Sequence, residues 1–350
     1  MLALILFAAV SGCAQGGRPI GDSSTTTAST MSIAPPTTSS PATTTPIDFD
    51  PYATAKPATS AVGTVSDEWV ETPDGRRRHF RLYVPRSLPE GEAAPLLIAL
   101  HGGLGSSDQF AVNSGLDGLA EANRFVVVYP DGIRAVPDRP GLQTWNGGYC
   151  CGPAVRQNVD DVGYVRLLIE LLEARFELDS ERIFAVGHSN GAIMAYRLAC
   201  ELSDRIVAIG VQAGSLGIDA CQPVKPVSLL HLHGLADSNH PLDGGLGTGV
   251  SGVAFRSGRA AVETIATVDG CDGEPVIEVT LSNPDVEVST WKNCRSGAEV
   301  RLVTVEGASH AWMGHAASSD AAAALVGEPY ADFDASRAIW SFLDQHPRGA

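Results

Sequence analysis

Basic side chains are scarce in this sequence of 350 residues, which has 24 lysines and arginines against 40 aspartates and glutamates and a formal net charge of −16. Nucleic-acid binding depends on clustered Lys and Arg, so we expect no nucleic acid among the partners of this protein. Aromatic residues make up only 6% of the chain and charged residues only 18%, but 44% is hydrophobic, which excludes a wholly disordered protein. The length suffices for one large α/β domain or two small ones.

Long hydrophobic runs are also missing. Residues 2–10 form a run of nine apolar residues, whereas a membrane span needs roughly 20, so this run has the size of a signal-peptide core. It leads through Ser11 and Gly12 into Cys13, and small residues before a cysteine resemble the lipobox of bacterial lipoproteins. The resemblance implies a lipoprotein-type signal at residues 1–13, cut before Cys13, whose acylated thiol anchors an extracellular protein at the cell surface. The alternative is an ordinary cleaved signal with an incidental cysteine.

Residues 14–60 have the composition of a linker. Threonine, serine and proline supply 25 of these 47 residues, and such a segment cannot build a hydrophobic core. We therefore expect a disordered tether, with the lipid as the only contact between the protein and a membrane. No second linker follows, so residues 62–347 are predicted to form one domain, which we expect to be a monomer.

The predicted domain begins with alternating polar and apolar residues at 65–85, around Pro73-Asp74-Gly75, which indicates an antiparallel hairpin with a tight turn. Short apolar runs rich in β-branched residues then recur, as is typical of parallel strands buried on both faces. These runs lie at residues 96–100, 125–129, 183–186, 206–211, 227–232 and 300–305, and helical patterns lie at 160–176, 190–202 and 334–343. The alternation predicts an α/β fold with a mostly parallel, doubly wound sheet and the hairpin on its leading edge.

A Gly-x-Ser-x-Gly motif occupies residues 187–191, directly between a predicted buried strand and a predicted helix. A sharp strand-to-helix turn holds the serine hydroxyl above the sheet, and the helix N-terminus supplies N–H groups where an oxyanion forms. The motif alone is weak in a chain with 37 glycines. Its position between strand and helix nevertheless predicts that Ser189 is a nucleophile.

The motif also predicts an acid and then a histidine after later strands, in the order Ser, Asp, His. Asp237 follows the predicted strand at 227–232, and His310 follows the predicted strand at 300–305. Asp243 is the competing acid, and His315 is the serious rival of His310, which we prefer because it follows its strand more directly.

Four other histidines are further alternatives for the base, namely His188, His231, His233 and His240. His231 and His233 would lie on the same face of one strand, which suggests a metal site. No third ligand stands at metal spacing, so we expect structural roles for both and no metal.

The strand predicted at 96–100 runs into His101-Gly102-Gly103. This sequence matches the loop whose backbone N–H joins that of Asn190 in an oxyanion hole.

Eight short motifs stand in order along the predicted domain: His101-Gly102-Gly103, Tyr129-Pro130-Asp131-Gly132, Thr144-Trp145-Asn146, Cys150-Cys151-Gly152, Val159-Asp160-Asp161-Val162, Gly187-His188-Ser189-Asn190-Gly191, His233-Gly234 with Asp237, and Gly307 with His310-Ala311-Trp312. Together these motifs resemble the polyhydroxybutyrate (PHB) depolymerase and feruloyl esterase family, in its secreted, LpqC-like branch. The resemblance covers nearly all of residues 65–347, and it implies an α/β-hydrolase fold and carboxylic-ester hydrolysis without a cofactor. It also implies a triad of Ser189, Asp237 and His310, with Gly103 and Asn190 as oxyanion donors.

Two tryptophans, Trp145 and Trp312, are candidates to bind the substrate, and burial in the core is the alternative. Six cysteines remain after Cys13, an even number that predicts three disulfides in an exported domain. Cys271 and Cys294 flank two predicted strands, so we expect them to pair. Disulfide geometry argues against a bond between the adjacent Cys150 and Cys151, which are expected to reach Cys200 and Cys221 in an order left open.

The leading hypothesis is a surface-tethered serine carboxylesterase. Feruloyl or acetyl esters on plant polysaccharide and polyhydroxyalkanoate esters are both open as substrates, because a triad does not encode the acyl group. Two alternatives are an acyltransferase of the cell envelope and a polymer-binding lipoprotein on an inactive hydrolase scaffold.

Overall fold

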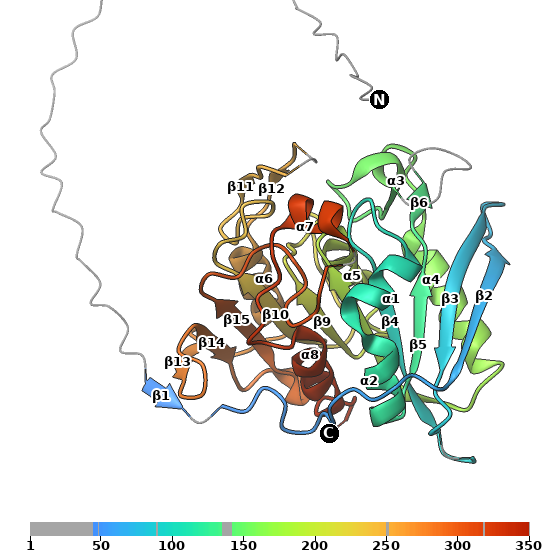
Figure 1. Cartoon of the computed structure of the whole chain (residues 1–350), viewed down its shortest axis with the longest axis horizontal. Helices are drawn as coiled ribbons and strands as arrows, with labels where there is room; N and C mark the ends of the chain where they lie inside the picture. Colours follow the sequence, from blue (N-terminus) through green and yellow to red (C-terminus); the bar gives the residue numbers. More distant parts are fainter. Residues whose placement is uncertain are drawn as a thin grey trace, which may run out of the picture. The chain divides into compact units, whose positions relative to one another are not determined.

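The computed structural model describes residues 45–47, 49–88, 90–134, 142–249, 252–317 and 319–349. These residues all belong to one compact unit built on a sheet of 11 strands (Figure 1). The expectations for the signal peptide, for Cys13 and for the first part of the tether lie outside the described residues. Within them, no helix combines the length and the apolar character that a membrane span needs.

The strands are β1 (Thr45–Ile47), β2 (Thr64–Glu71), β3 (Arg77–Val84), β4 (Ala94–Leu100), β5 (Val126–Pro130), β6 (Ile133–Arg134), β7 (Gln143–Thr144), β8 (Leu178–His188), β9 (Ala208–Gln212), β10 (Ser228–Gly234), β11 (Gly245–Leu246), β12 (Ala254–Phe255), β13 (Val276–Thr280), β14 (Val286–Trp291) and β15 (Val300–Val305). The helices are α1 (Ser107–Ser114), α2 (Leu116–Asn123), α3 (Gly152–Arg156), α4 (Asp161–Glu173), α5 (Asn190–Glu201), α6 (Gly258–Val268), α7 (Asp320–Val326) and α8 (Ala335–Asp344), with a 3-10 turn at Arg295–Gly297.

The order of strands in the large sheet is β1-β13-β14-β15-β10-β9-β8-β4-β5-β3-β2. The six predicted apolar runs correspond to β5, β4, β8, β9, β10 and β15, which are neighbours in this order and pair in parallel. The predicted hairpin is β2 and β3, which pair antiparallel at one edge. The predicted α/β-hydrolase fold, with its mostly parallel sheet and leading hairpin, is therefore confirmed.

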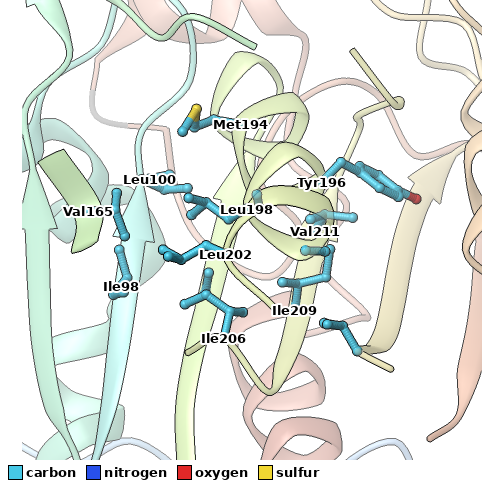
Figure 2. Packing of buried hydrophobic residues seen from close by; sticks show 14 of the residues in the cluster. Ile98, Leu100, Val165, Met194, Tyr196, Leu198, Leu202, Ile206, Ile209 and Val211 are labelled. Carbon is cyan, nitrogen blue, oxygen red and sulfur yellow. The ribbon is translucent and has the colours of Figure 1, made fainter. Parts of the chain in front are cut away.

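Helices cover both faces of the sheet because its central strands are apolar on both sides (Figure 1). In β4, Ile98 and Leu100 belong to the core formed with α4, α5 and α6, whereas Leu97 and Ala99 belong to the core formed with α1, α2 and α8. Successive side chains of a strand point to opposite faces, so one apolar run serves two cores. Figure 2 shows part of the first core, where Leu198 of α5 lies among side chains of the neighbouring strands.

The boundary predicted between tether and domain is wrong, because residues 49–60 pack on the domain. The Tyr52 hydroxyl accepts a hydrogen bond from the Asp334 N–H at 2.8 Å, and the Thr54 hydroxyl donates to the Ser341 carbonyl at 3.1 Å. Ala55 is buried. A count of Ser, Thr and Pro misses these contacts, because a few apolar side chains in the segment are enough to dock it on α8.

The disulfide prediction was right for one pair and wrong for the other four cysteines. Cys271 pairs with Cys294 as predicted. Cys200 in the last turn of α5 pairs with Cys221, and Cys150 pairs with its neighbour Cys151. The Cα atoms of Cys200 and Cys221 are 4.9 Å apart, within the usual range for a disulfide. With Cys271 and Cys294 also paired, Cys150 and Cys151 have no other cysteine partner among the residues that the structure describes.

Candidate active site

Ser189 stands at the junction of β8 and α5, in the sharp turn that the motif predicts. Its backbone has φ 54° and ψ −116°, and such a positive φ is uncommon for a residue with a side chain. The two glycines of the motif are required because other backbone atoms lie too close to them for a side chain to fit. A Cβ atom on Gly187 would collide with the Gly191 carbonyl, and one on Gly191 would collide with the carbonyl of Leu100 in β4.

The structure brings Ser189, His310 and Asp237 together from the ends of three different strands. His310 Nδ1 lies 2.7 Å from Asp237 Oδ2, and His310 Nε2 lies 2.9 Å from Ser189 Oγ. A carboxylate only accepts hydrogen bonds, so Nδ1 carries the ring proton and Nε2 accepts from the serine hydroxyl. The two residues that the sequence offered as alternatives to Asp237 and His310 have other partners. Asp243 pairs with an arginine of α6, and His315 pairs with Asp334.

Asp237 is buried and held as a carboxylate. Its Oδ1 accepts hydrogen bonds from the backbone N–H groups of Asn239 and His240, both at 2.9 Å. Burial alone would raise the pKa of Asp237, but the hydrogen bond and charge of His310, with the His240 N–H, lower it below its ordinary value. The acid is therefore preorganised in its ionised form.

Two backbone N–H groups flank the serine without an acceptor in the described part of the chain, those of Gly103 and Asn190. Gly103 lies against Asn190, because a Cβ built on Gly103 would be 3.4 Å from the Asn190 Cβ. The Asn190 side chain is fixed by Trp145, whose N–H donates to Oδ1 at 2.7 Å and whose carbonyl accepts from Nδ2 at 3.2 Å. The arrangement offers two donors on neighbouring segments to a developing negative charge.

Comparison with known proteins shows that the chain is similar to several esterases. A family model described as "Esterase PHB depolymerase" matches residues 79–240, which include Ser189 and Asp237 and end before His310. Feruloyl esterase B of Piromyces equi is 31% identical over 234 residues, which cover 65% of this chain and 41% of that protein. Residues 79–240 are therefore similar to the PHB depolymerase esterases.

Two further relatives extend this comparison. The bifunctional acetylxylan esterase/xylanase XynS20E of Neocallimastix patriciarum is 25% identical over 238 residues, which cover 67% of this chain and 31% of that protein. The chain thus spans less than half the length of this relative and of the Piromyces enzyme. An acetyl xylan esterase from Aspergillus awamori superposes with a TM-score of 0.54 at 16% identity, covering 71% of this chain and 94% of that one. This last likeness shows the fold.

Both tryptophans that were predicted to bind the substrate are buried. Trp145 is fully buried, and its Nε1 donates to the His101 carbonyl at 2.9 Å. Trp312 is also buried, with Nε1 donating to Ser336 at 2.9 Å. The substrate-contact prediction is therefore corrected: buried indole N–H groups need partners, and here those partners are protein atoms.

The His310 loop is held by His188, which the sequence offered only as an alternative base, and by Gln212, to which it assigned no role. His188, the variable position before the serine, donates from Nε2 to the His310 carbonyl at 2.8 Å, and the two rings lie 5.0 Å apart. Burial, followed by the charge of His310, lowers the pKa of His188 to about 3. Gln212 at the end of β9 donates to the Ala311 carbonyl and accepts from the Met313 N–H. The position of His188 inside the Gly-x-Ser-x-Gly motif could have indicated that it matters for the site, whereas nothing in the sequence pointed to Gln212.

The histidines considered for a metal form a buried hydrogen-bond chain instead. His233 Nε2 donates to the His240 carbonyl at 2.8 Å, so His233 Nδ1 accepts from His231 Nε2 at 2.9 Å. His231 Nδ1 in turn accepts from the Tyr196 hydroxyl at 2.6 Å. Burial lowers the pKa of His231 and of His233. The described residues contain no group of three or more His, Cys, Asp or Glu side chains suited to a metal ion.

Proposed function

We propose that this protein is a serine carboxylesterase in which Ser189, His310 and Asp237 form the catalytic triad. The observation that carries the proposal is the hydrogen-bond sequence from Ser189 through the His310 ring to Asp237, with distances of 2.9 and 2.7 Å. The strained turn at Ser189 and the match of residues 79–240 to an esterase family support the same conclusion.

The reaction proceeds through an acyl-enzyme. His310 Nε2 takes the proton of Ser189 while Oγ attacks the ester carbonyl, and Asp237 stabilises the resulting imidazolium. The carbonyl oxygen gains negative charge and accepts hydrogen bonds from the N–H groups of Gly103 and Asn190. His310 then gives its proton to the leaving alcohol, and a water molecule activated by the same ring releases the acid and restores the serine.

The substrates are polymer-linked or small neutral esters. Relatives are named feruloyl esterase and acetylxylan esterase, and the family description names PHB depolymerase, so three acyl classes stand out. Methyl ferulate, p-nitrophenyl acetate and short hydroxybutyrate oligomers represent these classes. The substrate with the highest kcat/KM identifies the acyl group that the site prefers.

Removing the nucleophile tests the proposal. We expect Ser189→Ala to lower kcat for p-nitrophenyl acetate by at least about 1,000-fold, because the acyl-enzyme can no longer form. Ser66→Ala in the edge strand β2 is the matched control, and it should retain the activity of the unmodified protein. Wild-type turnover in Ser189→Ala would refute the triad.

The esterase acts outside the cytoplasm, tethered to the cell surface through an acylated Cys13. Three disulfides fit an oxidising compartment, and the tether composition and the lipobox-like residues support the anchor. We expect the full chain to partition into the detergent phase of Triton X-114 when it is expressed in a bacterium that processes lipoproteins. Cys13→Ser should move it to the aqueous phase, and equal partitioning of the two proteins would refute the anchor.

A further inference from the structure

His101 lies directly before the glycines that carry the proposed oxyanion donor, and its side chain is fully buried. Both ring nitrogens have backbone partners. The Gly132 N–H points at Nε2 over 3.0 Å, and the Gly102 carbonyl faces Nδ1 over 2.8 Å. An amide N–H can only donate and a carbonyl can only accept, so Nε2 is the acceptor and Nδ1 carries the proton. The tautomer of His101 is thereby fixed.

The bond from His101 Nδ1 sets the orientation of the peptide between Gly102 and Gly103. The Gly102 carbonyl is held from two directions, by His101 and by the Gly105 N–H at 3.0 Å. This peptide is trans, so its N–H points away from its carbonyl. Holding the Gly102 oxygen on His101 therefore directs the Gly103 N–H to the opposite side. A flipped peptide would present a carbonyl oxygen where a negative charge must be stabilised.

The ring of His101 is itself immobilised and neutral. Trp145 packs against it with ring centroids 4.9 Å apart and donates from Nε1 to its carbonyl. The backbone of the same tryptophan holds the Asn190 side chain, so both proposed oxyanion donors are tied to one buried residue. Burial lowers the pKa of His101 and favours the neutral ring, although the carboxylates of Asp131 and Asp161 act in the opposite direction.

We propose that His101 is a positioning residue for the oxyanion hole: the proton on its Nδ1 fixes the peptide that presents the Gly103 N–H to the reacting carbonyl. The inference rests on the proposed esterase function. It assigns His101 an effect on the transition state, through Gly103, and no contact with the substrate. Loss of the Nδ1 donor should therefore lower kcat and leave KM nearly unchanged.

Two substitutions separate the two hydrogen bonds of the ring. In His101→Asn the amide nitrogen can occupy the place of Nδ1 and donate to the Gly102 carbonyl, while the link to Gly132 is lost. In His101→Gln the amide oxygen can occupy the place of Nε2 and accept from Gly132, while the donor to Gly102 is lost. Each variant removes one buried hydrogen bond, so a merely structural role predicts similar losses of thermal stability and of activity in both.

We expect His101→Gln to lower kcat at least about 10-fold with KM within about twofold of wild type. The reason is that a misoriented Gly103 N–H stabilises the negative charge of the transition state less well. His101→Asn should keep kcat within about threefold. Affinity for an aryl boronic acid, which forms a tetrahedral adduct with the serine, should fall in parallel with kcat/KM only in His101→Gln.

Equal loss of kcat in the two variants, or a loss that follows their melting temperatures, would overturn the role of His101. So would boronate affinities that are the same in both variants. These outcomes differ from failure of the proposed function, which is tested by Ser189→Ala: turnover in that variant would remove the triad whatever the His101 variants do.

Discussion

Asp269, which ends α6, is fully buried and incompletely paired. Its Oδ2 accepts a hydrogen bond from the Val227 N–H at 3.2 Å, but its Oδ1 has no partner among the described residues. Burial raises the pKa of Asp269 from 3.8 to about 7. The folded protein therefore binds a proton between pH 4 and pH 7 that the unfolded chain releases, and its stability declines as the pH rises through this window.

We expect Asp269→Asn to remove this decline, because the amide keeps an acceptor for Val227 without a charge. At pH 8 the variant should have a free energy of unfolding roughly 2–4 kcal/mol above that of the wild type, and near pH 4 the difference should vanish. Urea unfolding at pH 4.5, 6 and 8 measures this. The exposed Asp272→Asn is the control, and a pH-independent difference for Asp269→Asn would contradict the assignment.

Which single side chains come together was predictable where a motif fixes both the local turn and the order of its partners along the chain. Ser189 lies in a motif with a defined turn, and the order Ser, Asp, His then leaves few positions for the partners. The roles of His188 and Gln212 depend on which carbonyl lies across from them in the fold. The local sequence does not show which carbonyl group a side chain will face in the folded protein. The contacts of His188 and Gln212 could therefore be found only in the structure.

Among whole elements, the central strands were predictable because each is a continuous apolar run. The main helices were predictable because their apolar residues recur every three or four positions. Residues 45–60 were not, because their contacts are few and distant in sequence. β1 pairs with β13, and residues 52–55 contact α8 and the loop before it. A segment with the composition of a tether thus contributes a strand and a docking surface to the domain.

Truncation tests the structural role of this segment. A chain that starts at residue 61 should lose about 2 kcal/mol of unfolding free energy relative to one that starts at residue 45, because it loses the buried Ala55 side chain, apolar surface of Tyr52 and several hydrogen bonds. Chemical denaturation of the two proteins measures the difference. Equal stabilities would mean that residues 45–60 act only as a tether.

At the scale of the whole molecule, two of the three disulfides between described residues close loops of similar length, and the third closes none. Cys200–Cys221 and Cys271–Cys294 join residues 21 and 23 positions apart, whereas Cys150–Cys151 joins neighbours. Closing a loop of this size removes about 3 kcal/mol of conformational freedom from the unfolded chain, and a bond between neighbours removes almost none. Cys200–Cys221 therefore ties α5 to a segment 21 positions away, and Cys271–Cys294 ties the residues that follow α6 to a segment 23 positions away, whereas the adjacent pair constrains only its own turn.

We accordingly expect Cys200→Ala with Cys221→Ala to lower the free energy of unfolding by about 3 kcal/mol, since the unfolded chain regains that freedom. Cys150→Ala with Cys151→Ala should lower it much less, and this double variant serves as the matched control for loss of a disulfide. Urea unfolding measures both, and mass analysis of an unreduced digest verifies the pairing. A peptide linking Cys150 or Cys151 to Cys200 or Cys221 would contradict the arrangement, and equal destabilisation of the two double variants would contradict its entropic basis.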